Sequence, residues 1–217
     1  MPSLATNETV EAAALRLRAG LAAPGLGQAV AAYFAEPEFA GMTFADLGRN
    51  PPGEIVPDDL LAVTLLDITW RPQVVRILLG TRKQQFSQML AGLPEATDLW
   101  DAGEEAMRRI DVMWDALTGI EGIGTASASK LLARKRPRLC PISDSVVIKA
   151  VDVPGRTWDV LRCLLQDPEA RADVEALRLA ATGASLLRIL DVALWVSHSR
   201  SAAAQQVRRQ AGMPAAD

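Results

Sequence analysis

The sequence predicts an all-α fold, and three features of its composition and pattern support that prediction. Apolar residues make up 49% of the 217 residues, and alanine and leucine are abundant among them. Only one tyrosine is present, so the mixture favours helices over sheets. Runs rich in valine and isoleucine are missing, which argues against a parallel sheet. We therefore expect about ten short helices around a substantial core.

Helical periodicity and capping residues place these elements in order. Asn7 or Thr6 can cap the first helix, and Pro57 begins another at a favourable first position. The last helix, over 184–199, is apolar on most faces, so we expect it to be the central buried helix. The complete set of expected helices covers 7–22, 25–35, 57–68, 71–79, 82–92, 98–101, 103–118, 125–135, 144–151, 155–166, 168–181 and 184–199.

The length of the chain suggests one large domain or two small ones. We expect a single helical domain over 1–217 that can divide into two lobes, 1–95 and 96–200, followed by a frayed tail over 201–217. Residues 36–56 are rich in proline and glycine and read as a long connection, with a short extended piece around Met42 to Phe44. Two roles stay open for this connection, covering a cleft and supporting a dimer.

Several classes of protein are excluded by what the sequence lacks. No apolar run is long enough to span a membrane, and Glu8 and Glu11 stand where a signal peptide needs basic and then apolar residues. Cys140 and Cys163 form neither a disulfide framework nor a metal motif. The single histidine, His198, excludes a site of clustered histidines. We therefore expect a cytoplasmic protein without a metal or an organic cofactor, and its oligomeric state stays open.

The charge of the chain is unevenly distributed, although the net charge is only −3. Residues 98–121 hold seven acidic residues against two arginines, whereas 122–143 hold no acid. The second segment contains a basic block of five positive charges, Lys130, Arg134, Lys135, Arg136 and Arg138. Such a block is the electrostatic footprint expected of a nucleic-acid-binding surface. The alternative is an ordinary solvated face.

The stretch GIEGIGTASASK, from Gly119 to Lys130, places three glycines in six residues between two expected helices. Glycine permits the positive φ of a tight bend and leaves backbone N–H groups uncovered. The helix that begins near Thr125 adds its unpaired amides and the positive end of its dipole. Such a surface attracts an anion, commonly a phosphate, and the basic block would add charged contacts. A bend with a purely structural role is the alternative.

The segment IEGIGTASASKLL, residues 120–132, resembles the helix-hairpin-helix motif of the helix-hairpin-helix DNA glycosylase superfamily. Glu121 stands where that motif usually has proline. The superfamily also carries a catalytic aspartate in a sequence like P-V-D-T-H-V, and CPISDSVV places Asp144 20 positions after Gly124. The resemblance covers residues 104–151 and implies a multi-helix, glycosylase-like fold.

This resemblance implies double-stranded DNA as the partner and base-excision repair as the activity. Asp144 would be catalytic, stabilising a developing oxocarbenium ion or orienting water once the base is turned out of the duplex. Ala126 occupies the position of the lysine that forms a Schiff base in bifunctional members, which excludes a lyase of that kind. A monovalent cation at the hairpin is also implied. The DNA-binding residues would be Gly122, Ile123, Gly124, Thr125, Ala126, Lys130, Arg134, Lys135, Arg136 and Arg138.

Three functions remain open on the sequence alone. The first is a monofunctional DNA N-glycosylase, a hydrolase that uses Asp144. The second is a non-catalytic helix-hairpin-helix module that binds DNA, and the third is a structural or protein-interaction domain. Asp144 itself has a structural interpretation as the N-cap of the helix that follows it. The base or lesion stays unidentified, because side chains from several helices build such a pocket.

Overall fold

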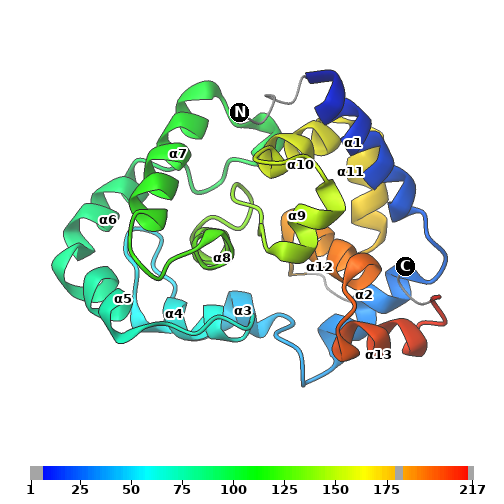
Figure 1. Ribbon diagram of the computed structural model, residues 1–217, viewed down its shortest axis with the longest axis horizontal. Coiled ribbons are helices and arrows are strands. Elements are labelled where there is room, and N and C mark those ends of the chain that lie inside the picture. Colours follow the sequence, from blue (N-terminus) through cyan, green and yellow to red (C-terminus); the bar gives the residue numbers. More distant parts are fainter. Residues whose placement is uncertain (1–6, 179–182, 215–217) are drawn as a thin grey trace. The chain divides into compact units, whose positions relative to one another are not determined.

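The computed structural model describes residues 7–178 and 183–214 (Figure 1). Within these ranges the regular secondary structure is entirely helical, which confirms the predicted all-α class. No helix in the same ranges is both long and apolar enough to cross a bilayer. Expectations about Thr6, 179–181 and 215–217 lie outside the described residues.

The chain forms two compact units whose boundaries differ from the expected lobes. Unit 1 combines Met1–Gly41 with Ser143–Asp217, and unit 2 is the segment between them, Met42–Ile142. The division expected at residue 95 instead falls within unit 2. Unit 1 is therefore built from two separate parts of the sequence, and unit 2 from one.

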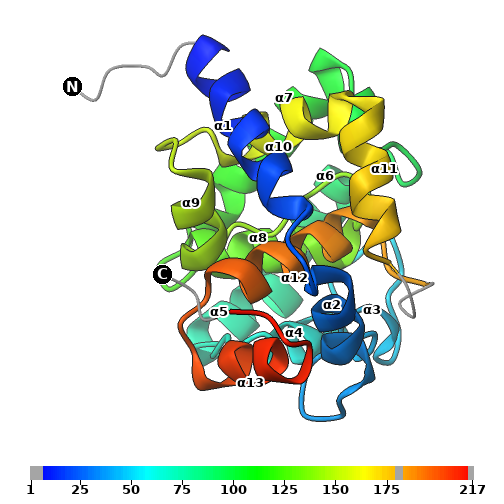
Figure 2. The same ribbon diagram turned by 90° about the vertical axis from the view of Figure 1, so that its right-hand side faces the viewer.

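Unit 1 contains seven α-helices in its described part. α1 packs on α10, and α2 packs on α12 (Figure 2). The helices are α1 (Asn7–Leu21), α2 (Leu26–Ala35), α9 (Ser145–Val151), α10 (Thr157–Gln166), α11 (Pro168–Ala176), α12 (Leu186–His198) and α13 (Ala202–Gln210).

The apolar sequence of α12 makes it a buried helix of unit 1, as predicted. Ile189, Val192 and Val196 are almost completely buried. Ser185 is the N-cap of the helix, and its side chain accepts a hydrogen bond from the N–H of Arg188. α12 contacts α2, α9, α11 and α13.

The segment expected to fray forms α13 instead. Ser201 caps this helix, because its Oγ accepts a hydrogen bond from the N–H of Ala204 at 3.2 Å. Ala204 and Val207 are buried against the rest of unit 1, and α13 packs on α2 and α12. The prediction of a frayed tail is therefore wrong for the helical part of 201–214, since a cap and an apolar face stabilise it.

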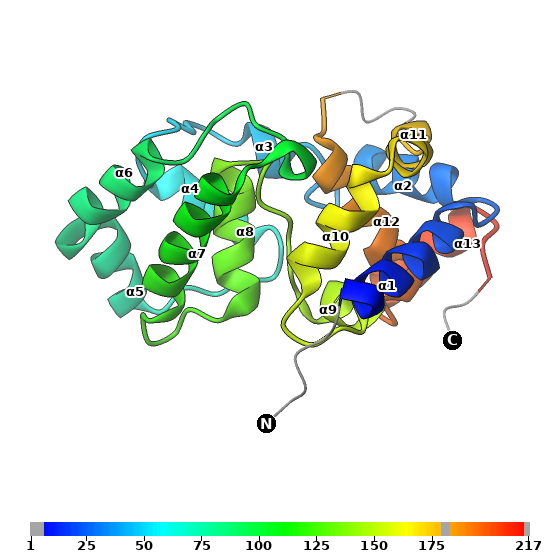
Figure 3. The same ribbon diagram turned by 90° about the horizontal axis from the view of Figure 1, so that it is seen from above.

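Unit 2 contains six α-helices, one π-helical segment (η1) and one 3₁₀ turn (η2) in its described residues. α8 packs on both α4 and α7 (Figure 3). The elements are α3 (Thr43–Asp46), α4 (Pro57–Thr64), α5 (Pro72–Arg76), η1 (Ile77–Thr81), α6 (Lys83–Ala91), η2 (Leu99–Asp101), α7 (Glu104–Thr118) and α8 (Thr125–Lys135).

The boundaries of α7 and α8 lie within one residue of their predictions, and other segments differ. The helix expected over 168–181 ends at Ala176, and the helix expected over 98–101 is the 3₁₀ turn η2. The extended piece expected around Met42 to Phe44 is the short helix α3. The helix expected over 71–79 is α5 followed by the π-helical segment. The helix expected over 57–68 ends at Thr64.

Candidate functional site

A glycine-rich bend, residues 119–124, joins α7 to α8 in unit 2. Gly122 has a φ of 96°, in the left-handed region that favours glycine. A Cβ added at Gly122 would lie 3.0 Å from Cδ of Arg71 and 3.3 Å from a methyl group of Val74. Both its backbone conformation and its close neighbours therefore require glycine at this position.

Two of the predicted DNA-binding amides are already used inside the bend. The N–H of Ile123 donates to the carbonyl oxygen of Ile120 at 3.0 Å. The N–H of Gly124 donates to Oγ of Ser127, also at 3.0 Å. The side chain of Ile123 belongs to the core of the unit. In this arrangement the amides of Ile123 and Gly124 are not available to a phosphate, which corrects the expectation for both residues.

Three other N–H groups remain available at the bend. Those of Gly122, Thr125 and Ala126 have no acceptor among the residues that the structure describes. Gly122 and Thr125 are exposed, and Ala126 is half-buried. The first N–H groups of a helix point away from its body and carry its positive dipole end. The bend therefore offers unpaired donors at its surface.

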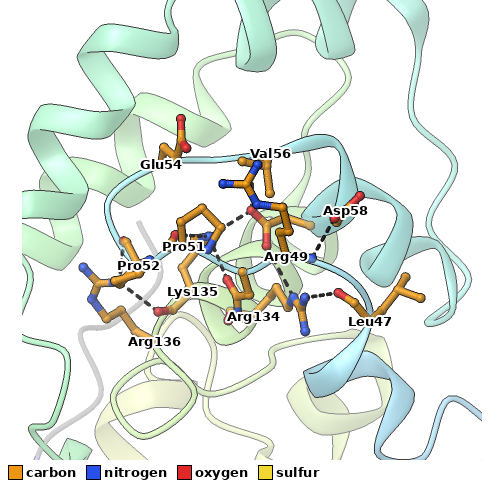
Figure 4. A network of polar contacts seen from close by, with 12 residues as sticks. Leu47, Arg49, Pro51, Pro52, Glu54, Val56, Asp58, Arg134, Lys135 and Arg136 are labelled. Carbon is orange, nitrogen blue, oxygen red and sulfur yellow. Dashed lines mark hydrogen bonds and ion pairs between the residues drawn. The ribbon is translucent and has the colours of Figure 1, made fainter.

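The basic block does not form the expected surface, because three of its side chains lie inside unit 2 (Figure 4). The side chains of Arg134 and Lys135 are 0% exposed, and Arg136 is also buried. Asp59, equally buried, accepts from Nζ of Lys135 at 2.9 Å and from Nε of Arg134 at 3.3 Å. In these positions Arg134, Lys135 and Arg136 cannot reach a DNA phosphate, which corrects their assignment.

These three cations bind the connection that precedes α4. Each donates to backbone carbonyl oxygens of residues 44–52, as Figure 4 shows for Leu47, Pro51 and Pro52. Burial lowers the pKa of the Lys135 ammonium, and the nearby Asp59 opposes that shift. The connection is thus held in place by the basic block. The other acceptors include Phe44 and Ala45 for Arg134, Asn50 for Lys135, and Leu90 and Leu93 for Arg136.

The two remaining members of the basic block also have internal partners. Lys130 is buried, and its Nζ donates to the carbonyl oxygen of Leu66 at 2.9 Å. Arg138 is exposed, and its Nε donates to Oδ1 of Asp98 at 2.8 Å. The block therefore presents one guanidinium at the surface, and that guanidinium is in an ion pair.

Arg71 is a cation beside the bend that the sequence does not predict. Its side chain is 65% exposed, and its Cδ lies against Gly122 of the bend. Its Nη1 lies 3.3 Å from Oε1 of Glu121, an exposed residue of the same bend. No local pattern links Arg71 to the bend, because Arg71 and Glu121 are 50 positions apart in the chain. The bend thus carries one positive and one negative side chain beside its unpaired amides.

Asp144 belongs to unit 1, where it caps α9. Its Oδ1 accepts hydrogen bonds from the N–H groups of Val146 and Val147, each at 3.0 Å. The residue before it, Ser143, is buried, and its Oγ accepts from Nε1 of Trp158 at 2.7 Å. The interpretation of Asp144 as an N-cap is therefore confirmed. These contacts hold its carboxylate in a fixed orientation.

Side chains able to ligate metals do not gather in the described part of the chain. No three of its histidine, cysteine, aspartate and glutamate side chains lie close enough together to hold an ion. Burial raises the pKa of the Cys140 thiol to about 12, so this thiol stays protonated at neutral pH. Burial also raises the pKa of Cys163.

Comparison with known proteins gives a family but no activity. Residues 27–198 match the model of DUF6308, a family of unknown function. Because this match covers most of the sequence, the chain belongs to that family. No curated protein and no solved structure matches the chain.

Proposed function

We propose that this member of the DUF6308 family binds duplex DNA through the bend at 119–124. The unpaired N–H groups of Gly122, Thr125 and Ala126 are the observation that carries the proposal. A backbone phosphate would accept from these donors at the start of α8, a helix of 11 residues whose dipole favours an anion there. The resemblance of residues 120–132 to the helix-hairpin-helix motif supports the same role.

The proposed contact differs from the sequence-based expectation in its source of positive charge. Arg71 lies beside the bend and replaces the buried basic block as the cation near the phosphate. Glu121 partly cancels its charge. Only one or two phosphates would then be neutralised, so we expect log K to fall with log salt with a slope of about −1 to −2.

Gly124→Asp tests the binding surface with little risk to the fold. A Cβ at Gly124 would meet nothing within 4 Å, and the residue is the N-cap of α8, where aspartate is favoured. The new carboxylate would accept from the amides that the phosphate needs, and it would repel the DNA. We expect the variant to lose most of its affinity for a random-sequence duplex, measured by fluorescence anisotropy at low salt.

Gly103→Asp is the matched control. Gly103 is the N-cap of α7 in the same unit, and a Cβ there also meets nothing within 4 Å. The Gly103→Asp substitution introduces the same charge at the start of another helix, and it should leave most of the affinity for DNA intact. Equal losses of DNA affinity in the two variants would contradict binding by the bend. If the natural protein shows no salt-sensitive binding to DNA, a structural or protein-interaction domain is favoured instead.

A monofunctional DNA glycosylase is the second candidate, supported by the fixed carboxylate of Asp144. Two amides orient its Oδ1, and such a carboxylate is suited to stabilising positive charge at a sugar. Incubation with duplexes that carry a panel of damaged bases should then give abasic sites, and Asp144→Asn should abolish them while leaving binding intact. If the natural protein produces none, the non-catalytic DNA-binding module remains.

A further inference from the structure

Unit 1 contains a cavity of about 250 Å³ that the proposed DNA contact does not use. Its walls come from α1, α9 and α12. Leu17 and Leu21 of α1 and Ala193 and Leu194 of α12 give it an apolar surface. A cavity with this lining favours an apolar ligand.

Polar side chains without internal partners also line this cavity. Arg16 forms no ion pair with any residue that the structure describes, whereas Arg18 on the same helix is bound to three carboxylates. The side chains of Ser197 and His198 donate and accept no hydrogen bond within the described chain. A guanidinium, a hydroxyl and an imidazole are therefore available to a ligand.

The electrostatic character of the cavity is positive. None of its lining residues is acidic. Partial burial, followed by the nearby charge of Lys149, lowers the pKa of the His198 imidazole. An anionic group would compensate Arg16 without a competing carboxylate from the wall.

Gly20 is an exposed residue of α1 that lines the cavity. A Cβ added at this position would meet no atom within 4 Å, and its backbone lies outside the left-handed region. Neither crowding nor conformation therefore requires glycine here, although glycine destabilises a helix relative to alanine. Gly20 is exposed, so a larger side chain can be introduced at the rim of the wall that α1 contributes.

We propose that this cavity binds a small apolar molecule that carries one carboxylate. The apolar part would contact the leucines and alanines, and the carboxylate would accept from Arg16 and Ser197. Apolar cavities of about 150 Å³ in proteins hold a benzene molecule. The larger volume here has room for a ring with a short acidic chain.

A matched pair of probes separates the two parts of this proposal. 3-Phenylpropionate carries the ring and the carboxylate, and 3-phenyl-1-propanol carries the same ring without the charge. Binding of each to the full chain is measured by calorimetry and by the NMR signals of His198, the only histidine. We expect the acid to bind about three- to tenfold more tightly than the alcohol.

Four variants test the charge of Arg16 and the volume of the cavity. Arg16→Gln should remove the advantage of the acid and leave the alcohol unaffected, while Arg209→Gln, at an exposed position of α13, should change neither. Gly20→Leu should fill the cavity and weaken both probes by about tenfold or more, whereas Gly20→Ala should weaken them less. Circular dichroism confirms that each variant is folded.

Three results would overturn the proposal. The first is that neither probe binds to the natural protein at millimolar concentration. The second is that the acid and the alcohol bind equally well and that Arg16→Gln has no effect on either. This result would contradict recognition of the carboxylate by Arg16. The third is that the probes still bind to the folded Gly20→Leu variant and leave its His198 signals unchanged. This result would show that the probes bind outside the cavity.

Discussion

Asp59 and Lys135 form an ion pair at 2.9 Å inside unit 2, and both side chains are fully shielded from solvent. The same carboxylate accepts from Arg134 and from the N–H of Val56. One buried acid therefore compensates two buried cations, and backbone carbonyl oxygens together with Oδ1 of Asn50 accept from their other donors. A buried charge that loses its partner destabilises a protein far more than an exposed one.

We predict that Asp59→Asn lowers the free energy of unfolding by about 3–5 kcal/mol, because it leaves Lys135 and Arg134 without a counter-charge. Urea unfolding followed by circular dichroism measures this loss. The control is Asp98→Asn, which breaks the surface pair with Arg138 and should cost about 0–1 kcal/mol. Similar losses in the two variants would show that burial of the network contributes little.

The charges beside the bend should act in opposite directions on DNA binding. Under the proposed function, Glu121→Gln removes a repulsive carboxylate and frees Arg71, so we expect affinity to rise about two- to fivefold. Arg71→Gln should lower it by a similar factor and reduce the salt dependence. Anisotropy titrations at two salt concentrations measure both effects. Unchanged affinity in both variants would exclude Arg71 from the interface.

The two roles of Asp144 can be separated by comparing two substitutions. Asp144→Ala removes the acceptor for Val146 and Val147, so we expect a loss of about 0.5–2 kcal/mol in stability. Asp144→Asn keeps a good capping residue and should cost much less. Thermal unfolding measures the difference. Equal stability of the alanine variant and the natural protein would mean that the cap contributes nothing.

His198 should titrate below its ordinary pKa of 6.5, because partial burial and the charge of Lys149 disfavour its protonated form. The unfolded chain then binds more protons in this range, so the contribution of His198 to stability is present above pH 6.5 and is lost as the pH falls through the lower, folded pKa. An NMR titration of the imidazole gives the pKa directly.

Lys149→Gln should raise that pKa toward its ordinary value, since one repulsive charge is removed. Lys83→Gln, which changes an exposed lysine of unit 2 paired with Glu54, is the control and should leave it unchanged. A pKa at or above 6.5 in the natural protein would contradict the effect of burial.

The helices could be predicted well because their signals are local. Pro57 at the start of α4 and the apolar pattern of α12 depend only on neighbouring residues, and both predictions agree with the structure. α13 is not among the expected helices, because the alanine- and arginine-rich end of the chain is expected to fray. The serine at 201 followed by Ala204 and Val207 on one face was the signal that could have identified it.

The candidate site was harder to predict, because its contacts join distant parts of the chain. A run of positive charges usually indicates a surface, and no local feature shows that residues 44–52 would enclose Arg134 and its neighbours. Asp59, 76 positions before Lys135, gives the pair its charge balance. Arg71 reaches the bend by a similar long-range contact. Of the three glycines in the bend, only Gly122 adopts the positive φ that glycine favours, whereas Gly119 and Gly124 have φ values of −70° and −100°.

The discontinuous sequence of unit 1 also determines the order in which the protein can fold during synthesis. Unit 2 has all of its residues once Ile142 has left the ribosome. α1 and α2 emerge earlier, but α10 and α12, on which they pack, are translated only after unit 2. The apolar faces of α1 and α2 therefore lack their packing partners while the whole of unit 2 is translated. During this stage of synthesis the exposed apolar surface makes the nascent chain prone to aggregation.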